Sequence, residues 1–165
     1  MNAAPATVER RVDVVAGLDE EQVCAAWELH REWAREDGSP LDPEIWADHM
    51  RGLVGSGKYN LWVAWDGPHA VGVAEMFTCF DPRSGQMVGQ GERTYILPAY
   101  RNARVFKAMY ESGLEAMKWL GIRRQRAVVS MDETGRFLQR FHEAHGLKPI
   151  EMVMERVIDD NGEVL

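Results

Sequence analysis

Residues 92–106 read Glu-Arg-Thr-Tyr-Ile-Leu-Pro-Ala-Tyr-Arg-Asn-Ala-Arg-Val-Phe. This order is typical of a strand that ends at Pro98, followed by a tight turn that opens a helix. The first N–H groups of a helix lack partners within the helix and carry partial positive charge, so they can bind a phosphate or pyrophosphate. Arg101 and Arg104 add positive charge at the same place. Because every helix has such an N-terminus, an ordinary turn with two solvated arginines is the alternative.

The rest of the chain alternates between helical and strand patterns. Apolar residues recur every three or four positions over residues 18–37, 43–55, 103–120 and 133–145, which predicts helices there. Short apolar or alternating runs predict strands at 10–15, 61–65, 70–80, 87–97, 126–130 and 149–157. This order predicts an α/β fold, in which about four helices flank a mixed, mostly antiparallel sheet. Gly89 and Gly91 inside one strand indicate a bulge or a close approach to the backbone by a ligand.

Length and charge limit what the protein can be. A chain of 165 residues is the size of a single domain, which we expect over residues 9–158, between a flexible N-terminus (1–8) and a polar tail (159–165). The 26 acidic and 19 basic residues give a net charge of -7, which argues against a nucleic-acid or membrane binder. No run of 18 apolar residues and no signal-type segment occurs, so we expect a cytoplasmic protein.

Two segments resemble a known family. The sequence Tyr-Ile-Leu-Pro-Ala-Tyr-Arg at 95–101 and the sequence Phe-His-Glu-Ala-His-Gly-Leu-Lys-Pro at 141–149 resemble the acetyl-CoA-binding half of the GCN5-related N-acetyltransferases (GNAT). The order of elements matches that fold over residues 9–158. The resemblance implies a single-domain GNAT-like fold. It also implies an enzyme that transfers an acetyl group from acetyl-CoA to a primary amine, by direct attack in a ternary complex.

The same resemblance assigns the cofactor site. It implies that pantetheine lies along Ile96 and Leu97, and that a loop of pattern Gln/Arg-x-x-Gly-x-Gly/Ala wraps the pyrophosphate. This chain has Arg104 and Phe106 where the family has small residues that let the backbone approach closely. We expect Phe106 to turn into the apolar side of its helix and Arg104 to reach toward the phosphates. The loop residues are Arg101, Asn102, Ala103, Arg104, Val105 and Phe106.

The altered loop leaves two functional classes open. Some phage-encoded members resemble this chain in having such loops, which suggests a phage-type member. The competing hypothesis is a non-catalytic binding or interaction module that keeps the GNAT fold and has lost coenzyme A. A homodimer is compatible with either class.

Acetyl transfer to an amine needs a base, because only the neutral amine attacks, and often an acid for the leaving thiolate. By resemblance, Glu92 is the base and His142 takes the place of the family's usual tyrosine acid. The alternative for Glu92 is a solvent-facing strand residue paired with Arg93 or Arg101. The alternative for His142 is a position at the solvated end of its helix, where positive charge is favourable.

The acceptor side is less well defined by sequence. The resemblance places an acceptor pocket near the first two helices, which makes Trp27 a candidate substrate-binding residue, although aromatic residues at helical spacing are more often core. Glu75 interrupts an apolar strand, so it should either have a buried partner or line the pocket. His30 and His49 have no ligand-like spacing, so we assign no metal.

Overall fold

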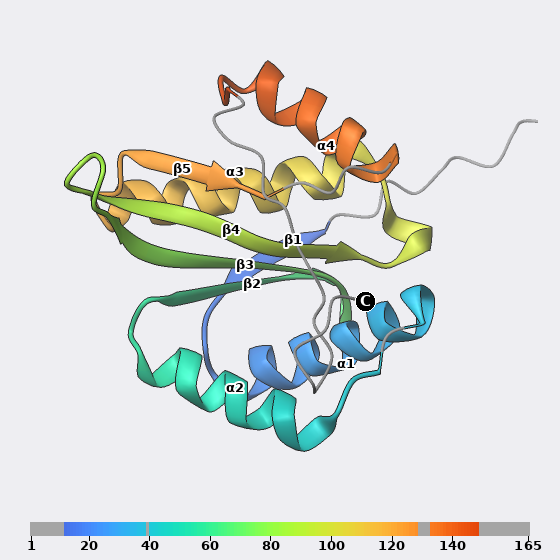
Figure 1. Cartoon of the computed structure of the whole chain (residues 1–165). Helices are drawn as coiled ribbons and strands as arrows, with labels where there is room; N and C mark the ends of the chain where they lie inside the picture. Colours follow the sequence, from blue (N-terminus) through green and yellow to red (C-terminus); the bar gives the residue numbers. More distant parts are fainter. Residues whose placement is uncertain (1–11, 39, 129–132, 149–165) are drawn as a thin grey trace, which may run out of the picture. The chain divides into compact units, whose positions relative to one another are not determined.

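The computed structural model describes residues 12–38, 40–128 and 133–148 (Figure 1). The chain divides into two compact units, Met1–Val128 and Val129–Leu165. The predicted N-terminal segment, the polar tail and the strand predicted at 149–157 lie outside the described residues.

The first unit contains a five-stranded sheet in which the strands lie in chain order. Neighbouring strands are antiparallel, except that β4 and β5 are parallel, so the predicted mixed, mostly antiparallel sheet is confirmed. The sequence placed the ends of the first and last of these strands one to three residues away from their observed bounds. The strands are β1 (Asp13–Ala16), β2 (Tyr59–Asp66), β3 (His69–Asp81), β4 (Gln86–Ile96) and β5 (Arg124–Ala127).

The helices begin where the sequence supplies caps. The Asp19 side chain accepts from Gln22 N, and the Asp42 side chain accepts from Glu44 N and Ile45 N, which satisfies donors at the first turns. The four predicted helices are confirmed as α1 (Glu20–Asp37), α2 (Pro43–Gly55), α3 (Ala103–Trp119) and α4 (Glu133–Ala144). A short 3-10 turn (Pro98–Tyr100) joins β4 to α3. In the second unit, α4 is followed by Gly146 at φ 90, a left-handed end that glycine favours.

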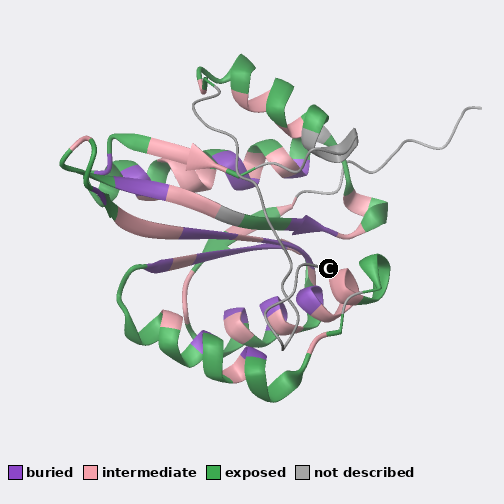
Figure 2. Cartoon of the chain, in the orientation of Figure 1, coloured by how far each residue is buried: buried purple, intermediate pink, exposed green. Residues whose placement is uncertain are grey.

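Helices cover both faces of the sheet, with α1 and α2 on one face and α3 on the other (Figure 1). The buried side chains lie where helices and strands face each other (Figure 2). The α1 face is rich in aromatic residues, and the α3 face is built from aliphatic residues and methionine. Members of the core under α1 and α2 are Ala25, Ala26, Leu29, Trp46, Met50, Tyr59, Leu61, Val63, Val73 and Tyr95.

The pairing of β3 with β4 is irregular at one point. Glu75 lies opposite Arg93, whereas the next residue, Met76, lies opposite Gly91. Glu92 is therefore an extra residue in β4, which makes a bulge and confirms one of the two alternatives that the glycines indicated. Bulges bend a strand and re-aim its side chains, so β4 changes direction beside the predicted base.

Candidate functional site

The first feature of the site is an open edge of β4. Its parallel pairing with β5 ends where Gly91 lies opposite Ala127, while its pairing with β3 continues to Ile96. Within residues 12–38, 40–128 and 133–148, no strand pairs with the β5 side of β4 beyond Gly91. β4 is therefore paired with β5 only along its first part. The second half of β4 presents backbone groups on the side that faces β5.

The direction of these backbone groups follows from one hydrogen bond. Leu97 N donates to Val71 O of β3 at 2.9 Å, and backbone groups of successive residues point to opposite sides of an antiparallel strand. The N–H and C=O groups of Ile96 and Thr94 therefore face the open edge. The N–H of Leu97 points toward β3 instead. Of the two residues predicted to contact pantetheine, only Ile96 therefore has its backbone groups at the open edge.

The second feature is the N-terminus of α3, which begins next to the end of that edge. Asn102 caps the helix, and its side-chain oxygen accepts from Arg104 N and Val105 N at 3.1 Å each. Its amide group donates to Tyr100 O at 3.0 Å. Two of the donors that a phosphate could use are therefore already satisfied by the protein itself, and Asn102 would have to move for a phosphate to reach them.

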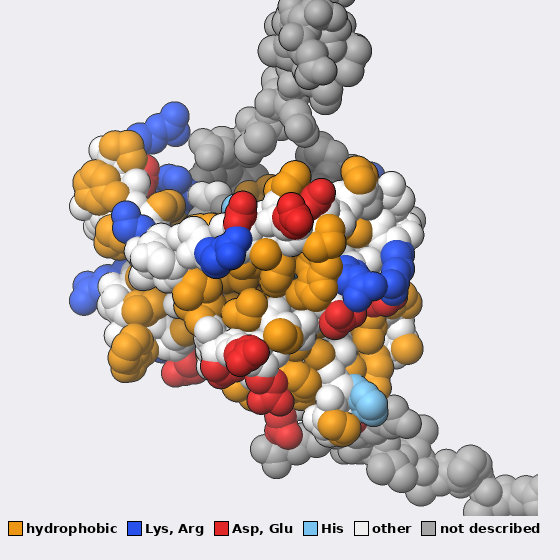
Figure 3. Space-filling view, turned by 90° about the horizontal axis from the view of Figure 1, so that it is seen from below, with side chains coloured by type: hydrophobic (Ala, Val, Ile, Leu, Met, Phe, Trp, Pro, Cys, Tyr) orange, Lys and Arg blue, Asp and Glu red, His pale blue; other side chains and the backbone are white. Residues whose placement is uncertain are grey.

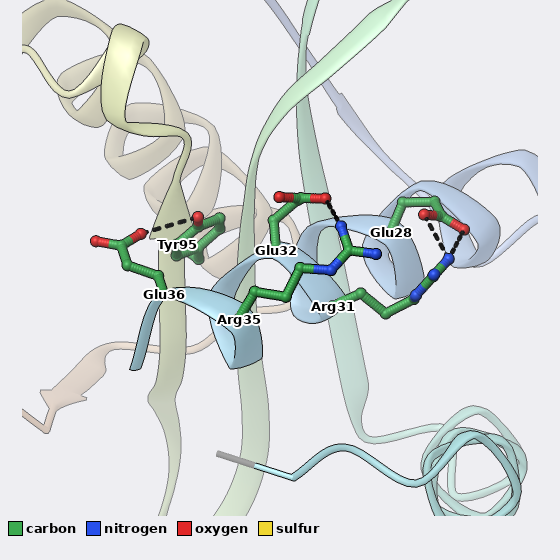
Figure 4. Close-up of polar contacts among 6 residues, drawn as sticks. All are labelled: Glu28, Arg31, Glu32, Arg35, Glu36 and Tyr95. Carbon is green, nitrogen blue, oxygen red and sulfur yellow. Dashed lines mark hydrogen bonds and ion pairs between the residues drawn. The ribbon is translucent and has the colours of Figure 1, made fainter. Parts of the chain in front are cut away.

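Arg101 is held by the end of α1. Its guanidinium binds both carboxylate oxygens of Glu36, its Nε donates to Ile96 O at 2.9 Å, and it lies over the ring of Tyr95. Tyr95 also donates to Glu36 at 3.0 Å (Figure 4). The hydrogen bonds from Arg101 hold the pKa of Glu36 below its usual value, although partial burial opposes this. The side chain of Arg101 thus joins α1 to the turn before α3.

Two side chains in the first turn of α3 pack into the core. Val105 is buried among Ala64, Val71, Ile96 and Met109, and Phe106 packs against the same cluster. The expectation that Phe106 joins the apolar side of the helix is confirmed. Arg104 is exposed, and Ala103 begins the helix. Phe106, which stands at one of the family's small-residue positions, therefore does not fill the space in front of the helix.

The third feature is a buried polar network under α1 and α2. His30 Nε2 lies 3.0 Å from Glu75 Oε1, and the side chains of both are 5% exposed. Trp46 Nε1 donates to His30 Nδ1 at 2.8 Å. Because Nδ1 accepts a hydrogen bond, the proton of a neutral His30 lies on Nε2, where it faces Glu75. Glu75 therefore has the buried partner that its position in an apolar strand requires.

The charge of Glu75 is stabilised by its surroundings. Burial alone would raise the pKa of this carboxyl, but the contact with His30, the interaction with Tyr59 and the charge of Arg93 together lower it. The same environment raises the pKa of Tyr59, first through burial and then through the charge of Glu75. Glu75 is thus a carboxylate at neutral pH, fixed between α1, β2 and β4.

Aromatic and charged side chains of α1 surround this network. Trp27 packs on Trp46 with ring centroids 5.0 Å apart, and Trp33 stacks on Tyr95 at 5.8 Å. Arg31 lies over Trp27 and binds Glu28, and one turn later Arg35 binds Glu32 (Figure 4). The outer surface of α1 and α2 shows a central apolar area bordered by charges of both signs (Figure 3). Trp27 is half-buried, so it belongs to both the core and the surface.

The two predicted catalytic residues lie in different units. Glu92 is the bulge residue of β4, and Arg93 beside it is exposed. His142 lies in the last turn of α4, half-buried, and burial together with the neighbouring His145 lowers its pKa. The role of each in catalysis stays a prediction.

Sequence reasoning missed the partners that join distant segments. Glu36 and Tyr95 hold Arg101, and His30 with Trp46 holds Glu75. The only signal was the cost of burying an unpaired carboxylate, which required a partner for Glu75 without identifying it. Among the described residues, no group of three or more His, Cys, Asp or Glu side chains is placed to hold a metal ion. No helix within the described part of the chain is long and apolar enough to cross a membrane.

No family model and no curated protein sequence matches the chain. Solved structures do match. AAC(6')-Iy in complex with the bisubstrate analogue CoA-S-monomethyl-acetylneamine is similar at TM-score 0.74 and 16% identity, covering 90% of this chain and 99% of that chain. The aminoglycoside antibiotic 6'-N-acetyltransferase AAC(6')-Ih from Acinetobacter baumannii gives 0.69 and 17%, covering 90% and 99%.

A ribosomal-protein-alanine N-acetyltransferase from Brucella melitensis biovar Abortus 2308 gives a TM-score of 0.68 and 16% identity, covering 89% of this chain and 99% of that chain. Identities this low establish the fold alone. The chain folds as these GNAT acetyltransferases do, which confirms the fold predicted from the segments 95–101 and 141–149.

Proposed function

We propose that this chain, which has the GNAT fold, transfers an acetyl group from acetyl-CoA to a primary amine. The observation that carries the proposal is the open edge of β4, which leads directly to the N-terminus of α3. An edge whose backbone groups pair with no described strand suits a ligand with amide groups in its chain, and a helix N-terminus suits a phosphate. Pantetheine pyrophosphate has both.

The residues present fit acetyl-CoA. The backbone groups of Thr94 and the N–H of Ile96 would pair with the pantetheine arm, next to Leu97, whereas Ile96 O already accepts from Arg101 Nε. At the start of α3, the loop would hold the pyrophosphate through its backbone donors once Asn102 gives them up, and exposed Arg104 would add charge. Arg101 would act on the phosphates only after it leaves Glu36. The loop comprises Arg101, Asn102, Ala103, Arg104, Val105 and Phe106.

Bound acetyl-CoA supplies a thioester, so that a C–N bond to the amine forms, the C–S bond breaks and the coenzyme leaves as a thiol. Glu92, at the bulge, would take the proton of the ammonium group directly or through water. His142 would give a proton to the leaving sulfur, and its lowered pKa leaves it mostly neutral, so water is the alternative donor. No covalent bond to the protein is required.

The acceptor would approach from the α1 side, past Trp27. Similar structures include enzymes named for aminoglycosides and for the alanine of a ribosomal protein, both of which present an amine. The net charge of -7 favours a cationic amine on a small molecule or a protein. Glu75, which is 6% exposed, would lie beneath this acceptor side and contribute a fixed negative charge to it.

The competing function is a non-catalytic module that keeps the fold without the coenzyme. Two observations favour it: Asn102 already satisfies two donors of α3, and Glu36 already neutralises Arg101. Both contacts are reversible because they involve exposed side chains. The two functions therefore differ in one measurable quantity, the affinity for acetyl-CoA.

Calorimetry with acetyl-CoA distinguishes the enzyme from the non-catalytic module. Release of the coenzyme thiol is then assayed with an aminoglycoside, a polyamine and an alanine-terminated peptide as acceptors. We expect binding, and a loss on the order of 1 to 3 kcal/mol for Arg104→Ala, as for a charge-assisted contact, that shrinks as salt rises. Lys107→Ala, one turn further along α3, is the matched control and should bind normally. No binding at millimolar acetyl-CoA would favour the module instead.

A further inference from the structure

Arg93 lies on the acceptor side of the sheet. It is directly opposite Glu75 across β3 and β4, and opposite residues of an antiparallel pair point to the same face. Glu75 contacts His30 of α1, so that face is the one covered by α1 and α2. The Arg93 side chain is exposed, unlike Glu75 beneath it.

Arg93 also stands where the open edge ends. The edge runs from the N-terminus of α3 along Ile96 and Thr94 to Gly91, where β5 rejoins β4. A ligand whose phosphate lies at α3 and whose arm follows this edge has its far end beside the bulge, at Glu92 and Arg93. The reactive end of acetyl-CoA and the guanidinium of Arg93 would therefore come together.

The carboxylate under Arg93 cannot turn freely. His30 Nε2 lies 3.0 Å from Glu75 Oε1, and Trp46 Nε1 fixes the other side of the imidazole at 2.8 Å. These three side chains come from β3, α1 and α2 and are buried. A charge that is fixed in a buried place acts on an exposed neighbour through a low dielectric, more strongly than a charge in water would.

We propose that Arg93 faces the acceptor amine and favours its neutral form, and that Glu75, oriented by His30 and Trp46, is a positioning residue that holds Arg93 over the bulge. The inference rests on the proposed acetyl transfer. A positive charge beside an ammonium group lowers the pKa of that group, so more of the bound amine is in the form that attacks. Glu92 would then take the proton that Arg93 has made easier to remove.

The dependence of kcat on pH tests this, because it reports the groups of the bound complex. We expect Arg93→Met to move the acidic limb of the profile to higher pH, by about one pH unit, which is about tenfold in kcat below the limb. Glu75→Gln should move the limb in the same direction by less, because Arg93 loses its position. The charged or titratable groups facing Glu75 are His30, Tyr59 and Arg93.

The direction in which the acidic limb moves distinguishes a positioning role of Glu75 from a direct effect of its charge on the amine. If Glu75 acted on the amine itself, removal of its negative charge would move the limb to lower pH, which would overturn the proposal. In the Arg93→Met protein, Glu75→Gln should have no further effect, since a residue that acts through another adds nothing once that residue is gone. An additive shift would also overturn it.

Two variants of α1 serve as comparison. His30→Gln keeps an N–H donor toward Glu75 and should retain most of kcat, whereas His30→Leu should resemble Glu75→Gln. Leu29→Val changes the same helix within the core, where Leu29 is 2% exposed, and should leave the pH profile unmoved. A profile shifted equally by Leu29→Val would show that the network is only structural.

A readout without catalysis keeps this inference separate from the proposed function. In NMR spectra of the full chain without ligands, the Arg93 Nε–H signal, assigned by its absence in Arg93→Met, should be resolved in the native protein and lost in Glu75→Gln. A signal unchanged by Glu75→Gln would overturn the positioning role. An ordered Arg93 in a protein that acetylates no amine would instead overturn the proposed function.

Discussion

The two faces of the sheet are built from different chemistry. Under α3, the core consists mainly of aliphatic and sulfur-containing side chains with Trp62. Among the described residues its titratable members are tyrosines, buried Tyr110 and partly buried Tyr100, and neither of these two core clusters includes a carboxylate or a histidine. Under α1 and α2, the core also encloses His30, Glu75 and Tyr59, and Tyr95 reaches out of it to Glu36. The same strands supply both faces, since successive side chains alternate.

This difference separates packing from chemistry. Buried polar groups must be paired, and a buried ion pair contributes little net stability compared with apolar side chains of similar volume. The α3 face avoids that cost, so it can serve as the rigid support. The α1 face carries the cost of burying polar groups next to the bulge. We infer that His30, Glu75 and Tyr59 are there for the reaction rather than for the fold.

The α3 face leaves no room for a side chain at Gly89. A Cβ added at Gly89 would lie 2.7 Å from Met76 Sδ and 3.2 Å from Met117 Sδ. Gly89 therefore makes room for the side chains that pack under α3, and its place in β4 is explained without a ligand. Of the two glycines noted in this strand, only Gly91 borders the bulge.

The largest effect is expected on the α3 face. Met109, 3% exposed, packs with Val71, Ile96 and Val105, and Met109→Ala should lower the free energy of unfolding by about 2 to 5 kcal/mol. Because no titratable group is involved, the loss should be the same at pH 5 and pH 8 in urea unfolding. A loss that varies with pH would contradict the separation of the two faces.

If Glu92 is the base, Glu92→Gln should lower kcat about 100-fold or more, as expected for loss of a general base, and leave acetyl-CoA affinity unchanged. Glu111→Gln removes the same charge from the exposed side of α3 and should be as active as the native protein. Near-normal turnover of Glu92→Gln across pH 6 to 9 would exclude Glu92 as the base.

Local sequence predicted what depends on near neighbours. Asp19 and Asp42 cap their helices through bonds to residues two or three positions away, so these helix starts depend on local sequence alone. The turn after Pro98 and the left-handed end at Gly146 follow from the same short range. Asn102 caps α3, a local role that the resemblance did not indicate, and its assignment to the coenzyme stays a prediction.

Contacts between distant segments could not be read from the sequence. Glu36 and Arg101 are 65 residues apart, and His30 and Trp46 are 16 apart on different helices. The local sequence pattern around each of these residues fits a solvated surface position as well as a core position. Only the sheet register, which puts Glu75 opposite Arg93 and under α1, brings these groups together.

Stability as a function of pH tests the buried network. The contacts with His30 and Tyr59 lower the pKa of Glu75, despite its burial, so its carboxylate stabilises the fold above the unfolded pKa of about 4.3. This stabilisation is lost as pH falls through the folded pKa. Glu75→Gln should therefore cost about 1.5 to 3 kcal/mol near pH 7, and the difference from the native protein should shrink in acid.

Glu28→Gln, which breaks an exposed pair with Arg31 on the same helix, is the control and should change stability little at any pH. A cost of Glu75→Gln that grows as pH falls would show that the carboxyl is protonated in the folded protein.

Asn102 allows stability and binding to be separated. Asn102→Ala removes a cap and should cost about 1 kcal/mol of stability, but it frees Arg104 N and Val105 N, so acetyl-CoA should bind about fivefold more tightly. Asp42→Ala removes the cap of α2 at a similar cost and should not change the affinity. Weaker binding by Asn102→Ala would indicate that the side chain itself contacts the coenzyme.

The smallest effect is expected where α1 meets the turn before α3. Glu36 and Arg101 are 40% and 45% exposed, and ion pairs at such positions contribute at most about 1 kcal/mol, so Glu36→Gln should cost about 0.5 kcal/mol of stability. If Arg101 can act on the phosphates only after leaving Glu36, the same change should tighten acetyl-CoA binding about twofold, and less so in high salt. Glu32→Gln, one turn earlier on α1, breaks the comparable pair with Arg35 and should leave the affinity as it is. Weaker binding by Glu36→Gln would mean that the pair positions the turn, and that α1 supports the coenzyme side as well as the acceptor side.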